Sequence, residues 1–249
     1  SRKPNNSYIE KPIMIFDQMN IQKFYNSELG LTVHECITKE ISTRWTDLNS
    51  TRILGVGFSS PYIKTYNKNQ NNIISLLPPI PSIEFAAGNS ANQELISLFH
   101  EIPLPDLSID RIIIVHALEF SESANLMIRE LWRILTDNGK ILFIVPNRLG
   151  IWCRFDSNPF GFGRPYSPNQ LVRLLEDNLF TTIGRNTALY MPPIKVRGMN
   201  SLSKGWEMFG RNTFPNLGGI ISIEAEKQIY SGNRVFASAQ KRSYAIVTS

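Results

Sequence analysis

The sequence has few of the residues that hold metals or form disulfides. Of its 249 residues only two are cysteines, Cys36 and Cys153, and three are histidines. Two thiols are too few for a disulfide framework or a cysteine-based zinc site, and the spacings CxxC and HxxxH are missing as well. We therefore expect no structural metal and a reducing compartment, the cytoplasm.

Long apolar runs and long basic runs are also missing. No stretch approaches the roughly 18 apolar residues that cross a bilayer, and the basic start at residues 1–11 is not followed by the apolar core of a secretory signal. We predict no membrane partner and polar tails at 1–12 and 232–249. The net charge of +5 favours a solvated basic surface over a nucleic-acid groove, because no Lys/Arg run is present.

The remaining composition, 42% hydrophobic and 19% charged, predicts one domain over residues 13–231. Its organising stretch is TRILGVGFSSPY, residues 51–62. A short apolar strand is followed by Gly55 and Gly57, which permit a tight turn, and then by the capping residues Ser59 and Ser60 and by Pro61. Strand, glycine turn and capped helix form a cofactor cradle in open α/β sheets, although an ordinary βα turn has the same pattern.

Apolar strands alternate with helical patterns along the rest of the chain. This alternation predicts a parallel sheet with helices on both faces. Two helices, 13–29 and 31–45, precede the first strand and should lie across its mouth. The predicted strands are 52–56, 73–77, 94–99, 111–115 and 140–145, with helices at 123–135 and 168–178. A half-exposed antiparallel pair, 180–190 and 220–230, closes the domain around an insertion at 191–218 that contains a short helix at 202–209.

Two polar groups follow the most apolar strand, RIIIV. His116 and Glu119 stand at its carboxyl end in the sequence HALEF. Ligands bind at this edge of open α/β sheets, so both residues are candidates for the site. The alternative is that His116 caps the next helix or is a buried histidine with its own hydrogen bonds.

A second informative stretch, PNRLGIWCRFDSNPFGFGRPYSPNQL, begins at residue 146. It follows a strand end and mixes glycine, proline, aromatic and arginine residues, which suits recognition of a planar or anionic group. The substrate-binding candidates are Asn147, Arg148, Trp152, Arg164 and Tyr166. The alternative is a structural loop whose aromatic residues pack on the domain itself.

These segments resemble a known family. The glycine turn, IPLPDLSIDRIIIVHALEF, RELWRILTDNGK and ILFIVPN, in this order, resemble the class I S-adenosylmethionine-dependent methyltransferases of the type 11 kind. LGVGFSSPY, HALEF and the stretch from residue 146 more narrowly resemble an uncharacterised alphaproteobacterial methyltransferase-like group. The match covers residues 53–230, most of the chain.

The resemblance implies a Rossmann-like sheet of order 3-2-1-4-5-7-6 with strand 7 antiparallel. It implies S-adenosylmethionine as cofactor, S-adenosylhomocysteine as product and an unidentified small-molecule or macromolecular acceptor. The cofactor-binding residues would be Gly55, Val56, Gly57, Phe58, Glu101, His116, Ala117 and Leu118. Three features depart from the family: the glycine motif is shortened to GVGFSS, no acid follows the strand at 73–77, and Glu101 is the nearest acid after the next strand.

Methyl transfer needs positioning more than acid–base chemistry. The candidates for a base are His116, Glu119 and Tyr166. No NPPY-type tetrapeptide follows the strand at 111–115, which disfavours a nucleobase or amide nitrogen as acceptor.

Two other hypotheses remain. One is an inactive methyltransferase fold that serves as a binding or assembly module; the other, disfavoured by the missing third glycine, is a nicotinamide-dependent oxidoreductase. A pocket over Gly55 and Gly57 would support catalysis, whereas filling by Phe58, Leu77 or Phe99 would support the binding module.

Overall fold

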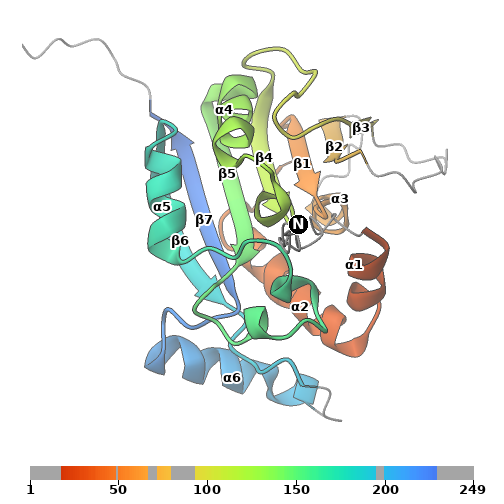
Figure 1. The fold of residues 1–249 in the computed structure, drawn as a ribbon, viewed down its shortest axis with the longest axis vertical. Helices are drawn as coiled ribbons and strands as arrows, with labels where there is room; N and C mark the ends of the chain where they lie inside the picture. The colour runs from red at the N-terminus through yellow and green to blue at the C-terminus, as the bar shows by residue number, and fades with distance from the viewer. Residues whose placement is uncertain (1–17, 49, 67–71, 80–92, 195–198, 229–249) are drawn as a thin grey trace, which may run out of the picture.

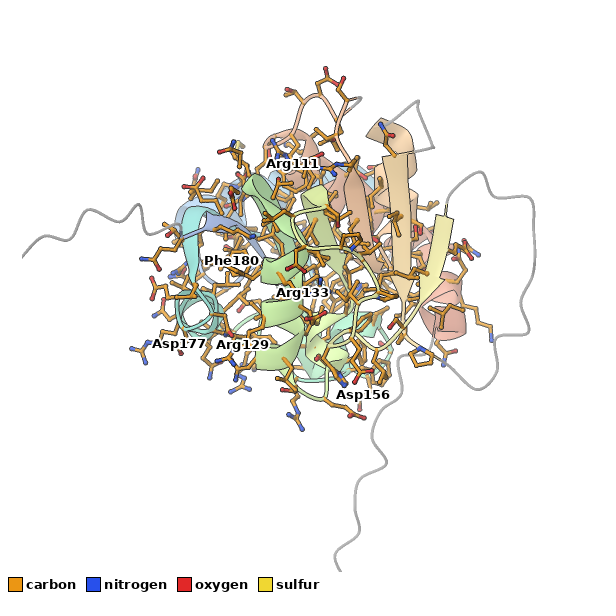
Figure 2. The ribbon with its side chains drawn as sticks, turned by 90° about the horizontal axis from the view of Figure 1, so that it is seen from above. Arg111, Arg129, Arg133, Asp156, Asp177 and Phe180 are labelled. Carbon is orange, nitrogen blue, oxygen red and sulfur yellow. The ribbon has the colours of Figure 1, made fainter. Side chains whose placement is uncertain are left out.

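A computed structural model describes residues 18–48, 50–66, 72–79, 93–194 and 199–228. Its centre is a seven-stranded sheet of order β3-β2-β1-β4-β5-β7-β6, the order that the family resemblance implied (Figure 1). Seen from above, the strands fan across the molecule (Figure 2). The predicted polar tails, 1–12 and 232–249, lie outside the described residues.

Five strands run parallel to one another and build one half of the sheet. They are β1 (Ile53–Gly57), β2 (Ile73–Leu77), β3 (Gln93–Ile96), β4 (Ile109–Val115) and β5 (Leu135–Pro146). Because β1 lies between β2 and β4, its carboxyl end and that of β4 meet at one edge. This is the edge at which parallel sheets bind ligands.

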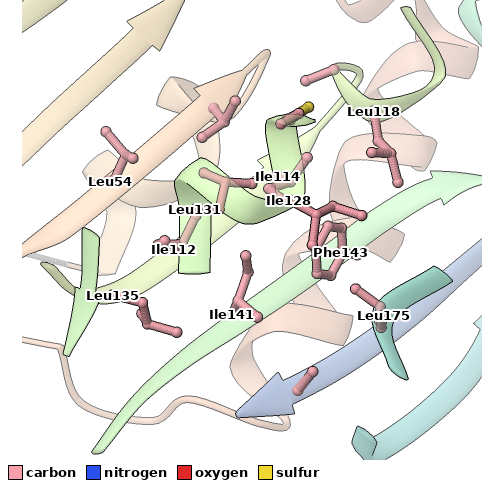
Figure 3. Packing of buried hydrophobic residues seen from close by; sticks show 14 of the residues in the cluster. Leu54, Ile112, Ile114, Leu118, Ile128, Leu131, Leu135, Ile141, Phe143 and Leu175 are labelled. Atoms are coloured by element: carbon pink, nitrogen blue, oxygen red, sulfur yellow. The ribbon is translucent and has the colours of Figure 1, made fainter. Parts of the chain in front are cut away.

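Alternation along β4 assigns its side chains to the two faces of the sheet. Ile113 and Val115 belong to one buried cluster, and Ile112 and Ile114 belong to the other. The second cluster lies under α4 (Ala124–Ile134) and α5 (Pro168–Glu176), as Figure 3 shows. The first lies under α1 (Gln18–Tyr25), α2 (Glu28–Ser42) and α3 (Ser60–Tyr66). Each face therefore has its own hydrophobic core.

The antiparallel pair is present, but one expectation about it was wrong. β6 (Phe180–Ala188) forms the edge, and β7 (Ile220–Lys227) lies between β6 and β5, antiparallel to both. Seven of the eight residues of β7 are buried, so the strand is not half-exposed. Its sequence alternates, but helices cover it on both faces of the sheet.

The boundary between the first two helices differs from the prediction. α1 ends at Tyr25, and Ser27 caps α2: its hydroxyl accepts a hydrogen bond from the amide of Gly30. Gly30 therefore lies inside α2 and does not stop a helix. A Cβ at this position would collide with the carbonyl of Phe24, so the glycine permits close approach of the two helices.

The end of α4 also differs from the prediction. The helix ends at Ile134, and residues from Leu135 onward are extended and belong to β5. Asn138 and Gly139 therefore lie within an extended segment and do not end a helix. By contrast, α5 begins as predicted, with Ser167 and Gln170 forming a reciprocal capping box before Pro168. The helix of the insertion, α6 (Met199–Thr213), is longer than the 202–209 predicted.

Arg133 joins α4 to the loop that leads into β4. Its guanidinium donates to the carbonyls of Ile102 and Leu104, both at 2.8 Å, and to the carboxylates of Glu130 and Asp106. These hydrogen bonds connect Arg133 (labelled in Figure 2) to a loop about 30 residues earlier in the chain.

We expect Arg133→Gln to destabilise the fold by about 1–2 kcal/mol at neutral pH. The hydrogen bond from Arg133 holds the pKa of Glu130 below its usual 4.5. A carboxyl with a lowered pKa in the folded state stabilises above its unfolded pKa and loses that contribution as pH falls. The difference between wild type and variant should therefore narrow as pH drops below 4.5.

Urea unfolding at pH 7, 5 and 3.5 measures this difference. Arg129→Gln is the matched control, since Arg129 is an exposed residue on the same helix (Figure 2). Equal losses of stability for both variants, or a pH-independent loss for Arg133→Gln, would contradict the assignment.

Candidate functional site

The glycine turn lies at the carboxyl end of β1, against the end of β4. Gly57 has φ of 71°, and the amide of Phe58 donates to the carbonyl of Val115 at 2.7 Å. A Cβ at position 57 would lie 2.5 Å from that carbonyl oxygen and 2.8 Å from the Cβ of Ala117. The turn is therefore held by the backbone of β4, and only glycine fits its second position.

His116 follows β4 in an unusual backbone conformation. Its φ is 50°, a left-handed value that is uncommon for histidine. The ring is 1% exposed and has a partner on each nitrogen: Nδ1 lies 3.1 Å from Oε1 of Glu119, and Nε2 lies 2.9 Å from the hydroxyl of Tyr25. Backbone strain of this kind gathers at functional sites, where the surrounding structure holds it in place.

The three side chains form one hydrogen-bonded chain. A carboxylate at Glu119 can only accept, so it takes the proton of Nδ1 and leaves the lone pair of Nε2 for the Tyr25 hydroxyl. The other oxygen of Glu119, Oε2, is buried and has no hydrogen-bond partner among the described residues. His116 and Glu119 lie together at the end of β4. His116 does not cap a helix, but it is a buried histidine with a partner on each ring nitrogen, as the other half of the alternative had it.

Tyr25 comes from α1 and covers Phe58 and His116. Its ring stacks on Phe58 with centroids 4.8 Å apart and planes at 16°. Burial, together with the neighbouring Tyr62, raises the pKa of Tyr25 well above its usual 10. The hydroxyl is therefore protonated and donates to His116. The two N-terminal helices thus lie across the mouth of β1, as the chain order predicted (Figure 1).

The residues that the sequence analysis proposed as fillers of the cleft are all buried. Phe58 is 4% exposed, Leu77 8% and Phe99 7%. The ring of Tyr25 covers the first of them. By the criterion set from the sequence, this closed conformation over the glycine turn supports the binding module.

The loop after β5 packs partly against its own domain. The amide of Asn147 donates to the carbonyls of Asn216 and Gly218, and its oxygen accepts from the backbone of Leu149. The indole of Trp152 is fully buried and donates to the carbonyl of Met191 at 2.7 Å. These contacts give both side chains a structural role in the described conformation.

The other three substrate candidates lie nearer to solvent. Arg148 donates through Nε to the carbonyl of Pro165, and Arg164 is exposed, while its amide donates to the carbonyl of Glu119 at 2.8 Å. Tyr166 is half-buried, and burial, followed by the charge of Glu119, raises the pKa of its hydroxyl. The segment that carries Arg164 and Tyr166 thus covers Glu119.

The polar groups at the ends of β1 and β4 fit the methionine part of S-adenosylmethionine better than its nucleoside part. Beside the glycine turn, Ser59 Oγ is buried without a partner among the described residues, as is Glu119 Oε2, so polar atoms are available at the ends of β1 and β4 for the methionine part. At the nucleoside end, β2 finishes in Leu77 and Glu101 is exposed. No acid among the described residues follows β2 directly.

A cavity of about 670 Å³ lies between α1 and the loop after β5. Three phenylalanines line it, Phe24, Phe120 and Phe162, with Lys23 and Asp156 among its charged residues. None of the substrate candidates from the sequence analysis lines this cavity, and neither does Gly55 or Gly57. Cavities of 300–1,000 Å³ with apolar walls suit small-molecule ligands.

Sequence reasoning missed Tyr25 and Phe160. Both were apolar members of patterns that predicted packing. Phe160 lies between the cavity and the site: its ring centroid is 4.9 Å from that of His116 and 6.2 Å from that of Phe24. The signal that marks Tyr25 is its hydroxyl on a helix face that is otherwise apolar.

Other kinds of site find little support in the described part of the chain. It contains no group of three or more His, Cys, Asp or Glu residues placed to hold a metal ion. None of its helices combines the length and the apolar character that crossing a membrane requires.

Comparison with known proteins supports the resemblance seen in the sequence. A family model described as a methyltransferase domain matches residues 40–143, from the end of α2 into β5. No curated protein sequence matches the chain significantly.

Solved structures share the fold at low sequence identity. A methyltransferase of Thermotoga maritima, described as S-adenosylmethionine-dependent and as a possible histamine N-methyltransferase, has a TM-score of 0.61 at 15% identity and covers 83% of this chain and 93% of its own. A putative methyltransferase of Haloferax volcanii, solved with the activator Trm112, has a TM-score of 0.57 at 12% identity over 85% and 98%. An S-adenosylmethionine-dependent methyltransferase of Aquifex aeolicus has a TM-score of 0.55 at 16% identity over 84% and 97%.

The prediction of a methyltransferase that uses S-adenosylmethionine agrees with both the family match and the fold. Residues 40–143 match the model of a methyltransferase domain, and the sheet has the strand order and fold of solved S-adenosylmethionine-dependent methyltransferases.

Proposed function

We propose that the protein transfers the methyl group of S-adenosylmethionine to an acceptor bound beside His116. The observation that carries the proposal is the left-handed Gly57 at the end of β1, packed against the end of β4, where His116 and Glu119 stand. A tight glycine turn of this kind lets a ligand approach the backbone closely.

The proposed cofactor residues surround that turn. Gly55, Val56, Gly57 and Phe58 supply the backbone of the turn, and His116, Ala117 and Leu118 follow β4; exposed Glu101 would serve the nucleoside end. S-adenosylmethionine supplies an activated methyl group on a sulfonium. The chain itself orients the acceptor and excludes water, which suits a site whose residues are almost fully buried.

The acceptor would enter from the loop after β5. Arg148, Arg154 and Arg164 are its exposed cations, and they would attract an acidic group on an acceptor. Asn147 and Trp152 would hold the loop that presents them. The free cysteines fit a reducing compartment, so we place the reaction in the cytoplasm.

Calorimetric titration of the purified protein tests the proposal. We expect micromolar binding of S-adenosylmethionine and of S-adenosylhomocysteine, and no binding of NAD, which would be the ligand of an oxidoreductase. If millimolar S-adenosylmethionine gave no heat of binding and no change in melting temperature, the methyltransferase assignment would be wrong.

A binding or assembly module is the second candidate, and the surface of α6 favours it. Trp206, Met208 and Phe209 are exposed there, by 40%, 69% and 58%, and Phe214 follows the helix with 51% exposed. Exposed apolar residues gathered on one element indicate a contact surface. A protein that fails to bind S-adenosylmethionine but pairs with another macromolecule through α6 would fit this reading.

A further inference from the structure

The Tyr25 hydroxyl occupies the position in which a substrate hydroxyl would be activated. It is a phenol, it lies 2.9 Å from Nε2 of His116, and the opposite nitrogen of the ring is held by Glu119 at 3.1 Å. At the end of β4, His116 Nε2 thus accepts a hydrogen bond from a phenolic O–H.

We propose that the methyl acceptor is a small-molecule phenol whose hydroxyl replaces that of Tyr25 on His116 Nε2. The inference rests on the proposed methyltransferase function and deepens it by naming the acceptor class. His116 is then the catalytic base, and Glu119 is a positioning residue that fixes the tautomer of His116. The Tyr25 hydroxyl is displaced from Nε2 when the acceptor binds.

The neighbouring cavity has the composition that such an acceptor requires. Its walls include Phe24, Phe120 and Phe162, and its volume of about 670 Å³ suits a small aromatic molecule. Phe24 directly precedes Tyr25, and Phe120 directly follows Glu119. The cavity and the hydrogen-bonded chain therefore share two segments, although the loop at 156–162 and Pro193 also line the cavity.

Phe160 forms the partition between the two. Its ring contacts that of His116 on one side, at 4.9 Å, and that of Phe24 on the other, at 6.2 Å. A ring bound in the cavity would reach Nε2 by moving Tyr25 aside and taking up the aromatic contacts that Tyr25 makes now.

The proton balance is complete. Nε2 of His116 takes the proton of the acceptor hydroxyl as the oxygen forms its bond to the methyl carbon, and the carbon–sulfur bond breaks with its electron pair going to sulfur. The products are the aryl methyl ether and S-adenosylhomocysteine. The imidazolium that forms is stabilised by the Glu119 carboxylate and returns its proton to solvent.

Other titratable groups face this chain from every neighbouring element. Tyr62 from α3 and Cys36 from α2 face Tyr25, and Tyr166 from the loop after β5 faces Glu119. Burial raises the pKa of the Tyr62 hydroxyl and of the Cys36 thiol above their usual values. Both are therefore neutral at physiological pH.

The test uses 4-nitrophenol and the full chain without cofactor, because the phenolate of this probe has its own absorbance band. We expect the bound probe to ionise about one pH unit below the free probe, a tenfold shift of the equilibrium. His116→Gln should remove the shift, while His100→Gln, at a histidine elsewhere in the chain, should leave it unchanged. Glu119→Gln should reduce it, because the imidazolium loses its counter-charge.

Tyr25→Phe keeps the test valid if His116→Gln does not fold. This change removes the competing hydroxyl and keeps the ring on Phe58, so the probe should bind about 3- to 10-fold more tightly. Tyr190→Phe is the matched control, since Tyr190 bonds to Thr187 and Pro215 instead, and it should bind the probe as wild type does.

The outcomes separate this inference from the proposed function. Binding of S-adenosylmethionine without any phenolate signal, or an equal effect of Tyr25→Phe and Tyr190→Phe, would overturn the phenol assignment and leave the methyltransferase standing. A phenolate signal that depends on His116 without S-adenosylmethionine binding would support the acceptor site and overturn the methyltransferase.

Discussion

Gly57→Val should destabilise the folded protein by more than about 3 kcal/mol, enough to unfold a large fraction of molecules. The residue has φ of 71°, and a left-handed conformation costs a residue with a side chain roughly 1–2 kcal/mol, more if it is β-branched. In addition, the new Cβ would lie 2.5 Å from the carbonyl oxygen of Val115, which is backbone and cannot move aside. Strain and collision thus add at one position.

Urea unfolding followed by circular dichroism measures this loss, with Gly205→Ala as the control. Gly205 lies within α6, and a Cβ there would meet nothing within 4 Å. That change should stabilise the protein by about 0.5–1 kcal/mol, because alanine favours a helix. If Gly57→Val kept wild-type stability, the glycine turn would have a different conformation from the one described.

Glu40→Ala should cost about 3–5 kcal/mol, the usual result of removing one partner from a buried charge network. The carboxylate is 4% exposed and accepts from Arg44 at 2.9 Å, from Asn186 at 2.9 Å and from Arg211 at 3.4 Å. It therefore joins α2 to β6 and to α6. Without it, the guanidinium of Arg44 stays almost buried with no carboxylate on it.

The free energy of unfolding of two further variants makes this test specific. Glu40→Gln keeps the shape and some hydrogen bonds but loses the charge, so its cost should be intermediate. Glu35→Ala changes an exposed residue of the same helix and should stay within about 0.5 kcal/mol of wild type. A loss for Glu35→Ala as large as that for Glu40→Ala would mean that helix propensity, not the network, accounts for the effect.

The fold was predictable because its signals are local and repeated. The buried strand at 73–77 has the bounds expected from its apolar run, and the capping box at Ser167 marks the start of α5. The burial of β7 was not predictable in the same way. Its alternation, IISIEAEK, is that of a half-exposed strand. Glu224 is nevertheless buried, and it accepts a hydrogen bond from the indole of Trp45, in the N-terminal region, at 2.8 Å. Such pairings between distant segments leave no trace in a local pattern.

The candidate site likewise contains residues that the sequence could reveal and residues that it could not. His116 and Glu119 could be found because they follow the most apolar strand, and strand ends are where parallel sheets place ligands. Tyr25 could not be found, because its role comes from a contact across 91 residues of sequence. The loop after β5 was located correctly, but which of its residues face the protein and which face the cavity depends on packing that spacing alone does not determine.

The central place of β7 has a consequence for how the protein is made. In the part of the chain that the structure describes, residues 220–227 form the last strand, yet they lie between β5 and β6 and pair with both. On the ribosome, β5 and β6 must therefore wait with open edges until β7 has been made, and open strand edges invite pairing with other chains. Chaperone demand and aggregation should concentrate in this interval, and chains ending before residue 220 should be found in inclusion bodies.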